Sequence, residues 1–432
     1  MNQNKQSRLF ATVLAAAAAI NASASGFRLA DQDAFATGRG EAFVATADNP
    51  SAIYYNPAGL TQLSGNNLRG GIYGIYLDPG YHPPSTAANA GQTYYDQNNL
   101  AAVPQFFYSS TLKNLPVSFG LGVYAPFGGN ISWPQDTGFR TAATDGSLTY
   151  LTINPAVAVK PLPGLSLGAG LMLNYVDMDF EQGLRIYQFS LPPNFNFYKF
   201  TGDGWSFGYN LGLLWQPIRQ ISLGATFRSS ARVNLDGHSE FAQPSAGISD
   251  TSLPAQMALV FPWDVVGGLS YRPTTNWNAE FDADYTDWSS FGTTTIYQEG
   301  NFTLAGPGVT QNPQVNFDWQ GSWMFECGVT RYFPRGWHAS AGYVFSENSV
   351  PNAYYTPLAA DLDRHFISAG VGHRGKRFDF DLACQFGYGP SHTVTDSSPP
   401  TKLGQSQGNP HPADGTYDFI SGAVLVTVGL HF

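Results

Sequence analysis

Apolar and polar side chains alternate with a period of two in many segments of this chain. From 378 to 386 the even positions are all apolar, and the odd positions hold Asp, Asp, Ala and Gln. Segments 277–285, 337–345 and 221–227 repeat the pattern. This period over about ten residues is the signature of a strand with one face in lipid and one face in a polar lumen. A soluble sandwich also alternates, but it seldom places so many aromatic residues on one face.

Turn signals divide the chain into strands of this kind. Short turns with Pro or Gly alternate with long polar loops, so that six short turns and seven long loops connect fourteen strands. Short turns on one side and long loops on the other are typical of outer-membrane barrels. The predicted strands are 67–78, 102–112, 117–127, 147–160, 165–187, 203–216, 221–236, 254–272, 276–288, 317–333, 337–346, 364–374, 378–388 and 416–432. The eighth is the weakest, because Pro262 interrupts it.

The composition excludes several other classes of protein. Charged residues make up 12% of the chain, whereas about 25% is usual for a soluble domain. No stretch of 18 apolar residues is present, which excludes membrane-spanning helices and leaves a closed barrel as the remaining way to cross lipid. The net charge of −10 argues against a nucleic-acid partner. We therefore predict an all-β fold, a fourteen-stranded antiparallel transmembrane barrel.

The two ends of the chain carry export and assembly signals. Lys5 and Arg8 precede a short apolar run and a small-residue site ending at Ala24, which predicts a signal peptide over 1–24. The last strand alternates and closes on Phe432, resembling the recognition signal of the barrel-assembly machinery. We expect a monomer in the bacterial outer membrane, in contact with its lipid and lipopolysaccharide.

Residues 25–66 precede the first strand and do not alternate. They contain many small and apolar residues. Such a segment either hangs in the periplasm or folds into the lumen, and the apolar content favours folding inside. A fourteen-stranded lumen is too wide to be filled by wall side chains alone. We predict an N-terminal hatch over 25–66 inside the barrel formed by 67–432.

Several short motifs follow one another along nearly the whole mature chain. They are SGFRL at 25–29, GRG at 38–40, ADN at 47–49, YNPAGL at 55–60, GLGVYAPFG at 120–128, LP at 253–254, YTDWS at 285–289 and DLDR at 361–364. In these motifs and in their order the chain resembles the FadL-type family of outer-membrane transporters of long-chain fatty acids and aromatic hydrocarbons.

The resemblance implies a transport route as well as a fold. The Asn-Pro-Ala motif would belong to the hatch, at Asn56, Pro57 and Ala58. Ligand would leave sideways through a gap beside an inward kink of the third strand, at Pro126, Phe127 and Gly128. Proline removes a ladder donor and glycine weakens pairing, so an opening there is physically reasonable. The alternatives are that Pro126 only ends the strand, and that ligand passes the hatch into the periplasm.

Side chains with chemical roles are few. We find no catalytic constellation and expect no enzyme activity, cofactor or metal site. A fatty-acid substrate would need a cation for its carboxylate, and Arg28, Arg140 and Arg228 are the candidates; an aromatic hydrocarbon would need none. Cys327 and Cys384 are expected to face lipid without forming a disulfide. Lumen acids should pair with hatch cations such as Arg28 and Arg39; these acids are Glu280, Asp282, Asp284, Asp379 and Asp381.

Two further classes of function remain as alternatives. A general diffusion porin would admit small polar solutes, but it needs no apolar hatch of 42 residues. A structural or adhesive barrel would have no ligand pocket. Outer-membrane transport of hydrophobic small molecules is the function that the residues favour.

Overall fold

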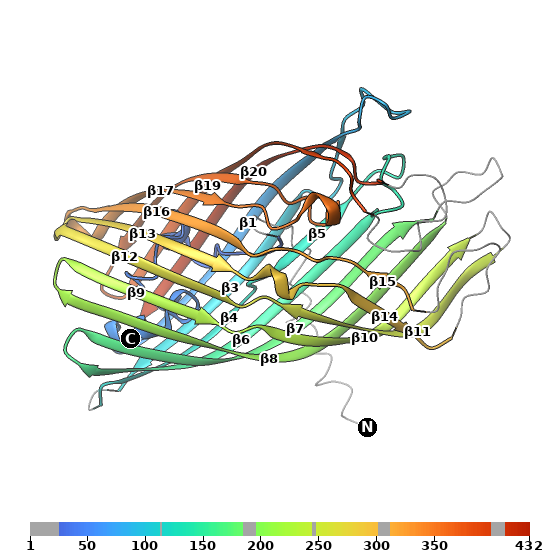
Figure 1. Cartoon of the computed structure of the whole chain (residues 1–432). Coiled ribbons are helices and arrows are strands. Elements are labelled where there is room, and N and C mark those ends of the chain that lie inside the picture. The colour runs from blue at the N-terminus through green and yellow to red at the C-terminus, as the bar shows by residue number, and fades with distance from the viewer. Residues whose placement is uncertain (1–25, 113–114, 185–195, 244–247, 301–311, 399–410) are drawn as a thin grey trace.

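The structure is a computed structural model, and it shows a closed, tilted β-barrel (Figure 1). It describes residues 26–112, 115–184, 196–243, 248–300, 312–398 and 411–432. The predicted signal peptide, 1–24, lies outside the described residues. Among the described residues, no helix has both the length and the apolar character that crossing a membrane requires.

Fourteen antiparallel wall segments form the barrel, as the sequence predicts. Its seam closes between the first and last strands, from Asn67 opposite His431 to His82 opposite Thr416. Two short strands, β2 (Tyr94–Tyr95) and β15 (Gln314–Val315), lie in loops. The wall segments are β1 (Asn66–His82), β3 (Leu100–Thr111), β4 (Val117–Tyr124) with β5 (Gly128–Ser132), β6 (Asp145–Leu162), β7 (Leu165–Gly183), β8 (Phe197–Ile218), β9 (Ile221–Arg228) with β10 (Ala231–Gln243), β11 (Ile248–Phe261) with β12 (Asp264–Thr274), β13 (Trp277–Thr286) with β14 (Thr294–Gln298), β16 (Ser322–Tyr332), β17 (Trp337–Ser346), β18 (Arg364–Arg374), β19 (Phe378–Val394) and β20 (Gly415–His431).

The two faces of the wall follow the predicted alternation. On β13, Phe281 is 48% exposed on the outer face, whereas its neighbour Asp282 is fully buried in the lumen. Both cysteines are free and exposed on the outer face, as expected. On β13 the apolar side chains face lipid because every second position is apolar.

The predicted strand boundaries are wrong at several places, because some wall strands are interrupted. The expected strands 221–236 and 254–272 are each two strands, broken at 229–230 and at 262–263. Pro262 has no N–H to donate to the ladder, which explains the second break. The tenth strand starts at Ser322 instead of 317. Several strands also extend into segments that we expected to be loops, as β10 does to Gln243.

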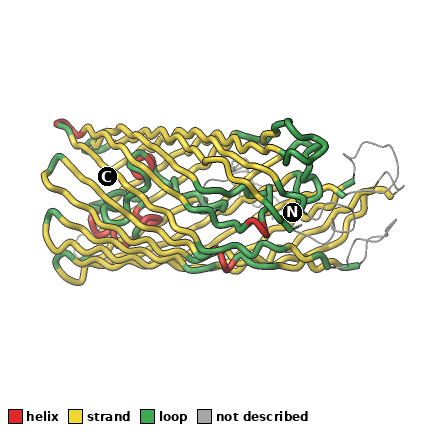
Figure 2. The backbone as a smooth tube through the Cα atoms, turned by 45° about the horizontal axis from the view of Figure 1, so that its top comes forward, coloured by secondary structure: helices red, strands yellow, loops and turns green. Residues whose placement is uncertain are grey.

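The described hatch residues, 26–65, lie within the lumen as short helical turns joined by loops (Figure 2). The turns are α2 (Ala34–Thr37), α3 (Ala52–Tyr55) and η1 (Pro57–Gln62). Asn56 caps η1 by accepting a hydrogen bond from the N–H of Ala58 at 3.2 Å. Proline at the first position suits such a turn, since its missing N–H would have no partner there.

Charged pairs connect this segment to the barrel. Arg28 contacts Asp284 at 2.7 Å and Arg39 contacts Glu280 at 3.3 Å, as the sequence suggested. The remaining expected lumen acids behave differently. Asp282 accepts hydrogen bonds from two hatch backbone N–H groups, whereas Asp379 and Asp381 pair with Arg69, a wall residue that also binds Asp33 of the hatch.

Candidate functional site

An apolar cavity lies inside the barrel beside the start of the hatch. Side chains from several separate parts of the chain line it, among them Phe27, Leu148, Phe180, Phe261, Phe291 and Trp319. Leu148 and Phe180 belong to regular wall strands and point inward by alternation. Phe27, Phe291 and Trp319 come from irregular segments, and Phe261 is the last residue of β11 before the wall is interrupted.

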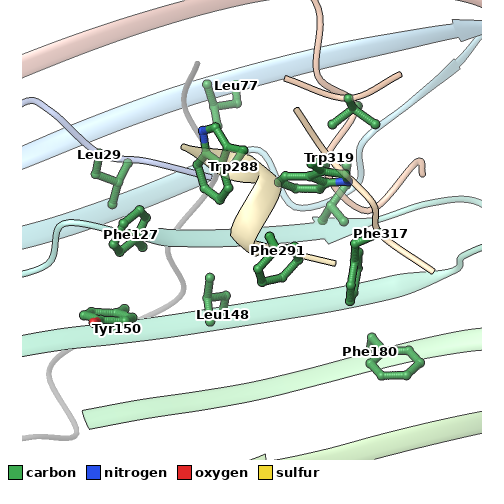
Figure 3. Close-up of a cluster of buried hydrophobic side chains, with 14 of the residues drawn as sticks. Leu29, Leu77, Phe127, Leu148, Tyr150, Phe180, Trp288, Phe291, Phe317 and Trp319 are labelled. Atoms are coloured by element: carbon green, nitrogen blue, oxygen red, sulfur yellow. The ribbon is translucent and has the colours of Figure 1, made fainter. Parts of the chain in front are cut away.

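Two inward excursions supply most of the aromatic lining. The wall leaves its plane after Thr286, where η4 (Trp288–Ser290) turns the backbone into the lumen and buries Trp288 and Phe291. The chain before β16 also turns inward, so that the rings of Phe291 and Phe317 lie 4.5 Å apart. These rings and Trp319 surround one volume together with the wall residues (Figure 3). The sequence did not reveal these rings, because 276–288 and 317–333 were expected to be regular strands and 289–316, which holds Phe291, a polar outer loop.

A second, smaller cavity lies next to the kink of the third strand. Its lining includes Tyr54, Tyr124, Pro126, Phe127 and Phe261. Phe261 therefore borders both cavities.

Closely packed rings separate the two cavities. The ring of Phe261 lies 5.3 Å from that of Phe127, 6.0 Å from that of Phe27 and 4.7 Å from that of Tyr150. Phe261 is the last residue of β11, directly before Pro262, so the break of the eighth strand positions this ring. The Pro262 interruption was the signal in the sequence that could have led to it.

At the kink the third wall strand is interrupted and then continues. It ends as β4 at Tyr124 and resumes as β5 at Gly128, so Pro126 does not stand at the end of the strand. β4 pairs with β3 only as far as Phe106, and β5 pairs with β6 on its other side. Within the described residues, β3 thus has no strand partner on this side over 100–105.

The hatch provides hydrogen-bond partners for the kink. The N–H of Leu29 donates to the carbonyl of Pro126 at 2.8 Å, and the N–H of Gly128 donates to the carbonyl of Phe27 at 2.9 Å. The amide of Gln32 donates to the carbonyl of Ala125 at 2.8 Å. The break in the third wall strand and the first residues of the hatch are therefore connected by hydrogen bonds.

Two of the three arginine candidates meet at the second cavity. Arg28 and Arg228 share Asp264, whose carboxylate lies 2.7 Å from Arg228 and 3.7 Å from Arg28. Arg228 also donates to the carbonyl of Tyr54 at 2.7 Å. Arg140 lies elsewhere, in a loop, where it donates to Gln135 and to two backbone carbonyls. All three guanidinium groups are thus engaged with protein partners.

The Asn-Pro-Ala segment packs against the wall formed by β7 and β8. The side-chain amide of Asn56 donates to the carbonyls of Val44, at 2.7 Å, and Leu213, at 3.0 Å. Close approach of the hatch backbone requires glycine in the wall here, since a Cβ on Gly168 would lie 2.4 Å from the nitrogen of Ala58. In the described part of the chain, no group of three His, Cys, Asp or Glu side chains is placed to hold a metal ion.

Comparisons with known proteins agree with this architecture. Residues 15–421 match the model of the family "Outer membrane protein transport protein (OMPP1/FadL/TodX)". The long-chain fatty acid transport protein of Escherichia coli O6:H1 is 22% identical over 403 residues, which cover 80% of this chain and 83% of that protein.

Two solved structures share the fold. The Pseudomonas aeruginosa FadL homologue has a TM-score of 0.79 at 18% identity, covering 94% of this chain and 100% of the other. The Pseudomonas putida toluene transporter TodX has a TM-score of 0.67 at 14% identity, covering 96% and 99%. Because the family model spans almost the whole chain, this protein belongs to the OMPP1/FadL/TodX family of outer-membrane transport proteins.

Proposed function

We propose that this protein carries long-chain fatty acids or hydrocarbons through the wall of the barrel. Ligand would bind in the apolar cavity, pass the ring of Phe261 into the second cavity, and leave sideways at the kink of Pro126, Phe127 and Gly128. The position of Phe261 between the two cavities is the observation that carries this proposal. A route that continues from an apolar cavity to a break in the wall suits a cargo that ends in lipid.

The energetics favour release into the membrane. Each buried CH₂ group is worth about 0.8 kcal/mol, so a long alkyl chain bound in the cavity would lose many kcal/mol on entering water. Lateral exit transfers the chain from one apolar environment to another. The fatty acid and toluene named for the relatives are both cargoes of this kind.

The hatch argues against a general diffusion porin. Its side chains and backbone are almost fully buried from Leu29 to Leu60, and it hydrogen-bonds to the wall on several sides. We propose that this segment blocks a straight aqueous path, and that Asn56, Pro57 and Ala58 fix it against β7 and β8. Removal of 30–60 should then let small polar solutes leak through.

We also propose the surroundings in which the protein works. Its outer face, with exposed Phe207 and Trp205 among other apolar residues, suits contact with membrane lipid and lipopolysaccharide. The last strand, with Val424, Val426 and Val428 exposed at alternate positions, suits recognition by the barrel-assembly machinery. A monomer suffices for the route described, because one chain supplies both cavities and the kink.

The experiment that tests the route straightens the kink. The double variant Pro126→Val and Gly128→Val restores an N–H donor and a strand-forming side chain. We expect uptake of labelled oleate into proteoliposomes to fall strongly while the barrel still resists SDS. The matched control makes the same changes at Pro273 and Gly267 of β12, a strand that does not pair with β4 or β5, and should transport normally. Normal transport by the straightened variant would favour passage past a moving hatch into the periplasm.

A further inference from the structure

Arg364, the first residue of β18, is a buried cation with unused hydrogen-bond donors. Its side chain is 2% exposed. Nη2 donates to the carbonyl of Ala360 at 3.1 Å, but within the described part of the chain Nε and Nη1 have no hydrogen-bond partner. A guanidinium stays charged in proteins, and a buried donor without a partner is costly. Arg364 is therefore placed to bind an acceptor from a ligand.

The side chain lies in a cavity that adjoins the apolar cavity. Leu77, Ile131 and Phe419 line it together with Arg364. The two cavities share Leu358 and Ala359 as lining residues. One molecule can thus lie with an apolar body among the aromatic rings and a polar end beside the guanidinium.

The contacts around Arg364 leave its free nitrogens available. The ring of Phe419 lies 4.1 Å from the guanidinium carbon and covers one face of the group. Asp361 lies 3.7 Å from Nη2, and its other oxygen accepts three hydrogen bonds from Gly26 and Ser349. Asp96 also lines the cavity; its carboxylate accepts two backbone N–H groups, and burial raises its pKa, which favours its neutral form.

The other buried arginines are less suited to bind a ligand. Arg28 and Arg228 are neutralised by carboxylates, and Arg140 is held by carbonyls. Within the described residues, Nε and Nη1 of Arg39 also have no hydrogen-bond partner. Arg39, however, belongs to the hatch, contacts Glu280 of the wall and lines none of the three cavities described above. Arg364 was not among the candidates from the sequence, where it appeared only within a family motif.

We propose that Arg364 binds the carboxylate of the substrate, and that the protein's substrates are long-chain carboxylic acids with the alkyl chain in the apolar cavity. This inference rests on the proposed function and narrows its substrate class. A carboxylate on Nε and Nη1 would form charge-assisted hydrogen bonds, which are about twice as strong as neutral ones. A neutral hydrocarbon would leave both donors unused.

Two ligands of equal chain length separate charge from apolar contact. Binding of oleate and of oleyl alcohol to the purified full-length protein in detergent is measured for the wild type, Arg364→Gln and Arg364→Lys. We expect the wild type to bind oleate more tightly than the alcohol. Arg364→Gln should weaken oleate binding about tenfold or more and change alcohol binding little, while Arg364→Lys should recover part of the difference.

The remaining outcomes are also decisive. Arg331→Gln, which removes an exposed cation stacked on Trp277 of the outer face, should bind both ligands as the wild type does. If Arg364→Gln binds oleate normally, or loses both ligands equally while remaining resistant to SDS, Arg364 does not bind the carboxylate. If the wild type binds neither ligand, the proposed function fails together with this inference. If the wild type binds both ligands with equal affinity, the carboxylate site is refuted while the proposed function stands.

Discussion

The contact between Gly168 of β7 and the Asn-Pro-Ala segment predicts that one added methyl group will displace the hatch. In Gly168→Ala the new Cβ would lie 2.4 Å from the nitrogen of Ala58 and from the carbonyl carbon of Pro57. Optimal contacts between such atoms are about 3.5–4.0 Å, so one backbone must move by about 1 Å or more. Both atoms that clash belong to main chains, so no side-chain rotation can relieve the overlap.

The cost follows from the contacts nearby. Overpacking of this kind costs about 1–3 kcal/mol. A shift of the hatch would also lengthen the 3.0 Å hydrogen bond from Asn56 to the carbonyl of Leu213, and a lost hydrogen bond costs about 0.5–1.5 kcal/mol. A total near 3 kcal/mol changes the ratio of docked to displaced hatch by more than a hundredfold.

Ion conductance in planar bilayers and sugar permeation in liposomes measure the result. We expect Gly168→Ala to assemble as an SDS-resistant barrel and to leak small polar solutes that the wild type excludes. The control is Gly267→Ala on β12, where an added Cβ meets no atom within 4 Å, and it should remain closed. If Gly168→Ala excludes ions and sugars as the wild type does and its hatch stays protected from protease, the backbone of β7 moves instead of the hatch. That result would refute this account of hatch docking.

Two further predictions concern the ring between the cavities and the outer face. Phe261→Ala should join the cavities and speed uptake of apolar substrates in proteoliposomes, at a stability cost of about 3–5 kcal/mol. The control is Phe207→Ala, which changes a side chain that is 79% exposed on the outer face. Unchanged uptake in Phe261→Ala would contradict a separating role for this ring. On the lipid face of β19, Cys384→Arg should lower folding yield more than Phe378→Arg, because arginine costs about 2–4 kcal/mol at mid-membrane and about 0–1 kcal/mol near the interface. Equal folding yields in lipid vesicles would mean that the depth assigned to these residues is wrong.

Much of the wall was predictable because its pattern is local. The residue that follows a lipid-facing position must face the lumen, so Phe281 and Asp282 could be placed from their order alone. Turn residues at regular spacing then determined the number of strands. The pairing of Arg28 with an acid of the ninth strand could also be expected, since a buried cation needs a partner and the lumen acids were visible in the alternation.

The interruptions were harder to predict because each depends on contacts between distant parts of the chain. Nothing near Phe291 or Trp319 indicates an inward turn; these rings are stabilised there by Phe27, more than 250 residues away in the chain. Pro262 was visible as a defect, but its consequence, a ring placed between two cavities, depends on Phe127 of another strand.

The sequence by itself determined the fold class and the family, because alternation, turns and motifs are properties of neighbouring residues. Only the tertiary structure decided which buried arginines already have their donors engaged by other parts of the chain. The donors of Arg28 and Arg228 are engaged by Asp284 and Asp264. Among the described residues, Nε and Nη1 of Arg364 have no hydrogen-bond partner, and its nearest acid, Asp361, lies 3.7 Å from Nη2. Whether a buried charge is already satisfied depends on what the fold brings within about 3 Å of it, and spacing along the chain does not contain that information.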